Sequence, residues 1–130
     1  MRTRVTAVVG AALLLAACGA TPPPPGPPSL PDPTPAGAHV VFEYSGVGAK
    51  QVDLTNRVAN AKTVSVHWFC LGDDLELASG ETTLVGSGCA RSSDGLTEYG
   101  GDIPLSLAST MAWLVKTGPD TVWRLAVTTT

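Results

Sequence analysis

The chain has 130 residues, with eight basic and eleven acidic side chains and a formal net charge of −3. Proteins that bind nucleic acids need clustered Lys and Arg to displace counterions, so this acidic balance argues against a nucleic-acid partner. Once a leader and a proline tract are set aside, the length leaves room for one folded domain of about a hundred residues.

The first 17 residues have the order of a bacterial signal peptide. Arg2 and Arg4 form a charged start, residues 5–14 are apolar, and small residues follow. The apolar run is well short of the roughly 20 residues that span a bilayer, so we expect a cleaved leader and not a retained transmembrane helix. Thr3 separates the two arginines, so the twin-arginine export signal is not met.

At Leu15-Ala16-Ala17-Cys18 the sequence resembles the bacterial lipobox. The resemblance implies cleavage before Cys18, a diacylglyceryl thioether on its sulfur, and a lipid anchor on the extracytoplasmic face of the cell membrane. Two or more acyl chains hold a soluble domain stably at a membrane, whereas one chain gives only marginal binding. The alternative is an ordinary secretory leader that a cysteine follows by chance.

A proline-rich linker is predicted for residues 18–37. Nine of the fifteen residues from 21 to 35 are proline, which favours an extended polyproline II tether of about 45 Å. The alternative is that residues 22–28 form a docking ligand for an aromatic groove on a partner.

Residues 38–130 are predicted to form one all-β domain, because short alternating runs are separated by turn residues and no helical periodicity is sustained. Residues 90–103 are expected to be a loop with at most one edge strand. Strands are expected at residues 39–45, 50–55, 63–70, 74–78, 82–85, 110–116 and 121–128. This pattern favours an antiparallel β-sandwich of immunoglobulin-like size.

Alternation assigns inward faces to several of these strands. The clearest case is residues 63–70, and Trp68 and Trp123 are expected in the core. The residues expected to face inward are Val40, Phe42, Tyr44, Val52, Leu54, Val64, Val66, Trp68, Cys70, Leu75, Leu77, Trp123, Leu125 and Val127.

The cysteine count is odd, with three in the chain. If Cys18 carries lipid, Cys70 and Cys89 remain as a pair. In an oxidising compartment we expect them to form a disulfide. The alternative is a metal or redox pair, but the chain lacks both a CxxC motif and a converging set of histidines.

The last two strands are predicted to form a hairpin around residues 117–120. Its register is open: an even loop places Trp113 opposite Arg124 on the exposed face, whereas an odd loop places Trp113 in the core beside Trp123. In the first case Trp113 and Arg124, with Tyr99, form a candidate binding surface for a carbohydrate.

No catalytic residue, cofactor or metal site is expected. Ser87 lies in Val85-Gly86-Ser87-Gly88, which lacks the first glycine of GxSxG. His67 is expected on the outward face of its strand, as a solvated histidine. The cluster Asp73-Asp74-Glu76 is the best calcium candidate, but a charged turn is favoured because no glycine-punctuated loop accompanies it.

The composition and the proline tether are similar to those of small cell-envelope lipoproteins of actinobacteria, as are Cys70-Leu71-Gly72, the downstream Cys89 and the closing Trp123-Arg124-Leu125. The resemblance implies an envelope role and supplies no catalytic residue. We therefore expect a lipid-anchored protein that displays a non-catalytic interaction domain to an envelope protein or glycan. The alternatives are a carbohydrate- or peptidoglycan-binding module and an accessory subunit of a hydrolase.

Overall fold

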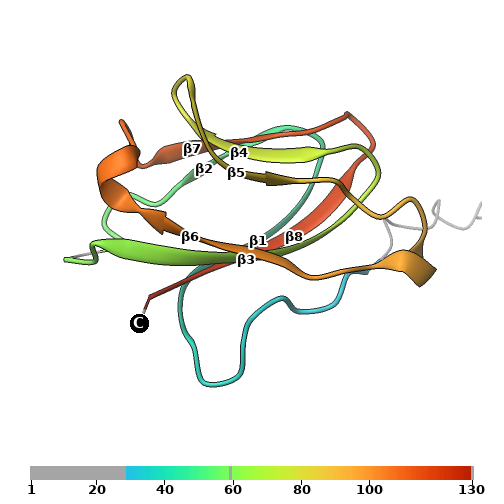
Figure 1. Ribbon diagram of the computed structural model, residues 1–130, viewed down its shortest axis with the longest axis horizontal. Coiled ribbons are helices and arrows are strands. Elements are labelled where there is room, and N and C mark those ends of the chain that lie inside the picture. Colours follow the sequence, from blue (N-terminus) through green and yellow to red (C-terminus); the bar gives the residue numbers. More distant parts are fainter. Residues whose placement is uncertain (1–28, 59, 130) are drawn as a thin grey trace, which may run out of the picture.

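The computed structural model describes residues 29–58 and 60–129, and it is a sandwich of two antiparallel sheets (Figure 1). The strands are β1 (His39–Val47), β2 (Lys50–Asp53), β3 (Thr63–Leu71), β4 (Leu75–Ser79), β5 (Thr82–Ser87), β6 (Tyr99–Pro104), β7 (Ala112–Lys116) and β8 (Val122–Thr129). Two short 3₁₀ turns accompany them, η1 (Ser93–Gly95) and η2 (Leu105–Leu107). The predicted all-β sandwich is confirmed. The predicted signal peptide, Cys18 and residues 18–28 of the predicted linker lie outside the described residues.

Each sheet has four strands. Sheet 1 has the order β1-β8-β3-β6, and sheet 2 has the order β2-β7-β4-β5. All neighbouring strands in both sheets are antiparallel. Antiparallel sheets of this kind bury one face and leave the other polar, which explains the alternation in the sequence.

Strand β3 follows the predicted alternation from end to end. Val64, Val66, Trp68 and Cys70 are buried, and the residues between them are partly exposed. Successive side chains of a strand point to opposite faces, so one face of β3 meets the core and the other lies outside the sandwich.

The prediction for β1 is wrong at its first inward position. A bulge shifts the pairing with β8 between Val40 and Phe42. As a result Val40 is 37% exposed, and Val41 packs against the core together with Phe42 and Tyr44. One extra residue in one strand reverses the face of the residues before it, which simple alternation does not anticipate.

The predicted hairpin of the last two strands is also wrong. β7 pairs with β2 and β4 in sheet 2, whereas β8 pairs with β1 and β3 in sheet 1. The turn at residues 117–121 therefore carries the chain from one sheet to the other. Both strands bury apolar residues in the space between the sheets, so their local pattern is the same as that of a hairpin.

The middle of the chain matches the prediction more closely. β4 and β5 form a hairpin whose turn contains Gly80 at φ +57°, a conformation that glycine adopts without steric cost. β6 is the single edge strand allowed for residues 90–103, and it ends at Pro104, which has no N–H for a further strand to use.

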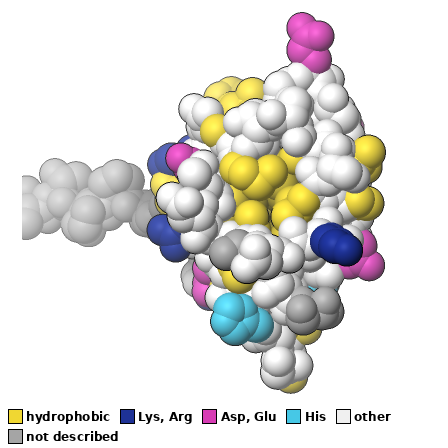
Figure 2. Space-filling model, turned by 90° about the vertical axis from the view of Figure 1, so that its left-hand side faces the viewer, with side chains coloured by type: hydrophobic (Ala, Val, Ile, Leu, Met, Phe, Trp, Pro, Cys, Tyr) yellow, Lys and Arg dark blue, Asp and Glu magenta, His cyan; other side chains and the backbone are white. Residues whose placement is uncertain are grey.

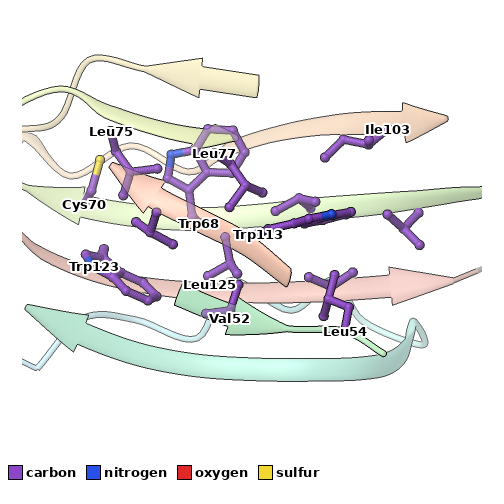
Figure 3. Close-up of a cluster of buried hydrophobic side chains, with 14 residues drawn as sticks. Val52, Leu54, Trp68, Cys70, Leu75, Leu77, Ile103, Trp113, Trp123 and Leu125 are labelled. Atoms are coloured by element: carbon purple, nitrogen blue, oxygen red, sulfur yellow. The ribbon is translucent and has the colours of Figure 1, made fainter. Parts of the chain in front are cut away.

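Three tryptophans dominate the core (Figure 3). Trp68, Trp113 and Trp123 are each 2% exposed or less. Every indole N–H has an acceptor within the protein: Ser87 Oγ for Trp68, the Thr110 carbonyl for Trp113 and the Gly48 carbonyl for Trp123, each at 2.9 Å. Buried indoles need such partners, so these bonds fix the three rings in the core.

The predicted disulfide between Cys70 and Cys89 is confirmed, with the Cα atoms 5.1 Å apart. Cys70 is on β3 in sheet 1, and Cys89 follows the end of β5 in sheet 2. The chain after Cys89 runs parallel to β3 for one bridge, where the Ala90 amide donates to the Cys70 carbonyl. The disulfide therefore joins the two sheets at one end of the sandwich.

Candidate functional site

Arg124 is the most fully bonded of the residues that the sequence singled out. It lies on the outer face of sheet 1, and its Nη2 and Nε donate to Glu43 Oε1 at 2.6 and 3.1 Å. Its Nη1 donates to the carbonyl of Leu30 at 3.2 Å, and Asp32 Oδ2 lies 3.8 Å from Nη2. A planar guanidinium can serve several acceptors at once, and here all of them belong to the same chain.

Those contacts hold residues 29–37, which we call the strap, on the outer face of sheet 1. Leu30 is 6% exposed and Pro33 is buried. Ala126 is also buried, although it alternates with the core residues of β8 and so faces the strap side. Figure 1 shows the strap, in light blue, on the side of sheet 1 that is turned away from sheet 2.

A carboxylate adds to this arrangement. The backbone amide of Thr34 donates to Asp32 Oδ1 at 2.9 Å. This bond, the proximity of the Thr34 hydroxyl and the charge of Arg124 hold the pKa of Asp32 below its ordinary value of 3.8. Asp32 is therefore an anion at neutral pH beside a cation that also bonds the strap backbone.

The exposed Trp113–Arg124 pair is not formed. Trp113 is 0% exposed and lies in sheet 2, while Arg124 lies on the outer face of sheet 1. Because the two strands are in different sheets, neither of the two hairpin registers applies, although Trp113 does join Trp123 in the core as the odd register expected.

Tyr99 is at the edge of sheet 1, where its ring stacks on Trp68 with 6.0 Å between the centroids. The structure therefore does not bring Tyr99, Trp113 and Arg124 together on one surface.

An open groove of about 620 Å³ lies over the outer side of β4 and β5 at the disulfide end. Its lining combines the acidic cluster with two cations, Arg91 and Lys116. Asp73 pairs with Arg91 at 3.6 Å, and Glu76 accepts a hydrogen bond from Thr83. Within residues 29–58 and 60–129, no three His, Cys, Asp or Glu side chains are arranged to hold a metal ion.

The nucleophile and base candidates are placed apart. Ser87 Oγ accepts the indole N–H of Trp68 at the edge of the core. His67 lies on the outer face of sheet 1 as predicted, with Nδ1 3.5 Å from Glu98. His39 Nδ1 lies 3.3 Å from Thr129 Oγ1. In the described part of the chain, both histidines therefore face polar partners other than Ser87.

The two ends of the sandwich differ in character. The disulfide end carries the Cys70–Cys89 bond, the groove and the junction of β1 with β2. The opposite end, which we call the far end, holds η2 and the loop between β2 and β3. Figure 2 looks onto the far end and shows apolar side chains gathered at its centre. Leu107 there is 56% exposed, and the partly buried apolar residues nearby are Val58, Ala61, Leu105, Ala108 and Met111.

The strap was missed at the level of sequence. Its signal was Leu30, the only large apolar residue in a stretch of prolines and small polar residues, followed by Asp32 two positions later. A spacer has no need of a buried leucine, and Arg124 on the last strand was its partner.

Comparison with protein-family models, curated proteins and solved structures found no match. The described residues include no helix of sufficient length and hydropathy to cross a bilayer.

Proposed function

We propose that this chain is a lipid-anchored envelope protein that displays a non-catalytic β-sandwich as an interaction domain on the extracytoplasmic face of the membrane. The observation that carries the proposal is the order of features before the domain: an apolar leader, Leu15-Ala16-Ala17-Cys18 and then a proline-rich stretch. Leader, lipid attachment and spacer follow one another as an anchored protein requires.

The cysteines support this proposal. Cys70 and Cys89 are bonded to each other, which leaves Cys18 as the third cysteine of the chain. A disulfide that joins the two sheets is suited to an oxidising compartment, where an exported protein would fold. Cys18 then has a chemical role of its own, as the acceptor of lipid.

The domain supports the display of an interaction surface better than it supports catalysis. Ser87 is bonded to a core indole and His67 faces a carboxylate on the outside of sheet 1. A nucleophile and its base must lie within hydrogen-bond reach of each other, and these two side chains belong to different faces of the sandwich.

Mass spectrometry of the protein purified from membranes of its host tests the anchor. We expect an N-terminal peptide that begins at Cys18 and carries the mass of two or three acyl chains. In cell fractionation, Cys18→Ser should move the protein out of the membrane fraction, whereas the matched control Ala20→Ser should leave it there. A mature chain that starts elsewhere, or a Cys18→Ser variant that stays membrane-bound, would refute the anchor.

A further inference from the structure

The strap reverses the direction in which the chain leaves the domain. β1 begins at the far end, where His39 pairs with Thr129. Nine residues earlier, Leu30 lies at the opposite end, in a pocket of about 310 Å³ that Val47 and Val122 also line. Val122 pairs with Leu71, the residue after Cys70, so this is the disulfide end.

We propose that the strap, held by Arg124, makes the chain exit the domain at the disulfide end on its way to the membrane anchor. The disulfide end then faces the membrane, and the far end points away from it. The orientation rests on the proposed anchor at Cys18, whereas the docking of the strap does not. Without the strap, the chain would leave the sandwich at His39, and the far end would be the end nearest the membrane.

Several contacts explain why the strap stays docked. Arg124 binds its backbone at Leu30 and lies beside the carboxylate of Asp32, and Glu43 holds the guanidinium in place from the neighbouring strand. Leu30 and Pro33 bury apolar surface. Prolines restrict the undocked chain, so the entropy lost on docking is smaller than for a flexible segment.

Docking also shortens the tether. The chain advances by eleven residue steps from Cys18 to Ser29 and by twenty from Cys18 to Ala38. At the polyproline II rise of about 3.1 Å per residue, the first segment spans about 35 Å and the second about 60 Å. A docked strap therefore keeps the domain closer to the membrane and fixes which end approaches it.

Backbone NMR relaxation of the protein tests the docking. We would purify it as its host makes it, in detergent micelles if it is lipidated and in buffer if it is not. We expect order parameters near 0.85 for Leu30, Asp32 and Thr34, similar to those of the strands, and values below about 0.6 in Arg124→Ala. The matched control is Arg91→Ala, which removes an exposed arginine whose ion-pair partner is Asp73, a residue outside the strap.

Strap residues that are as mobile as a chain end in the wild type would overturn the proposal. Unchanged order parameters in Arg124→Ala would overturn the role of Arg124. Unchanged resonances of β3 show that each variant remains folded.

Orientation is then measured in nanodiscs whose lipid headgroups carry a nitroxide. In the wild type, amides of η1 at the disulfide end should relax faster than those of η2 at the far end, and Arg124→Ala should reduce the difference. Faster relaxation of η2 in the wild type would overturn the orientation. Failure of the protein to join nanodiscs would refute the anchor and leave the relaxation result on the strap standing.

Discussion

Gly46 is predicted to be required by the indole of Trp123. A Cβ atom at Gly46 would lie 2.6 Å from Cζ2 and 2.9 Å from Cε2 of that ring, closer than non-bonded carbon atoms approach each other. The ring cannot move away easily because it is 0% exposed and its N–H is bonded to the Gly48 carbonyl. Overpacking of a core typically costs about 1–3 kcal/mol, so we expect Gly46→Ala to lower the free energy of unfolding by about 2 kcal/mol.

Urea denaturation followed by far-UV circular dichroism measures this change, and the melting temperature should fall by roughly 10 °C. Gly95→Ala is the matched control, since a Cβ there has nothing within 4 Å, and it should change stability by less than about 0.5 kcal/mol. Trp123→Phe removes Cζ2, the ring atom that would lie nearest to a Cβ at Gly46. In a double-mutant cycle, Gly46→Ala should therefore cost about 1 kcal/mol less in the Trp123→Phe background. Equal effects of the two glycine variants, or an additive cycle, would refute the reasoning.

Three further predictions concern the disulfide, a buried serine and one carboxylate. Replacing Cys70 and Cys89 together by Ala should lower the free energy of unfolding by about 3 kcal/mol, the chain-entropy value for a closed loop of this length, and a loss below about 1 kcal/mol in urea denaturation would contradict it. Ser79 is 0% exposed, and its hydroxyl donates to the carbonyl of Thr110 and accepts from the amide of Thr110. Ser79→Ala should therefore lower the free energy of unfolding by about 2 kcal/mol in the same assay. The exposed control Ser106→Ala should not lower it measurably. The side-chain and backbone hydrogen bonds from Thr55 hold the pKa of Asp53 below 3.8. The stability that this carboxylate adds should therefore be present above pH 3.8 and be lost as the pH falls through the lower folded-state pKa. An NMR titration that places the Asp53 pKa at or above 3.8 would contradict this prediction.

Much of the fold could be predicted from the sequence where a local pattern determines the answer. The alternation of β3 correctly assigned Val64, Val66, Trp68 and Cys70 to the core. Cysteine parity correctly paired Cys70 with Cys89, because two cysteines leave one choice once the third is set aside.

The predictions that failed depend on partners that are distant in the sequence. The alternation of Trp113 and Val115 in β7 is the same whether β7 pairs with β8 or faces it across the core. The bulge at Val40 likewise depends on how β1 meets β8. For the candidate site, the consequence was that the sequence left Trp113 open as a surface residue, whereas the structure buries it in the core.

Arg124 illustrates the same limit from the outside of the sandwich. On the sequence alone, an arginine between Trp123 and Leu125 is an exposed cation that a ligand could use. In the structure its acceptors are Glu43, 81 positions away, and Leu30, 94 positions away. No local pattern reveals pairs at such separations, and they convert a candidate ligand-binding residue into a contact that holds the strap.

Occupation of sheet 1 by the strap bears on where a partner can bind. No strap residue lines the groove over β4 and β5, and the outer face of sheet 2, where Leu114 is 38% exposed, belongs to the sheet that the strap does not cover. A partner that docks on either of them leaves Arg124 and Leu30 in contact. A partner that binds sheet 1 over β8 has to displace the strap first. Its apparent affinity is then its intrinsic affinity multiplied by the fraction of molecules with the strap undocked. Arg124→Ala should raise the affinity of such a partner and leave the affinity of the others unchanged, so this one substitution distinguishes the two classes of surface.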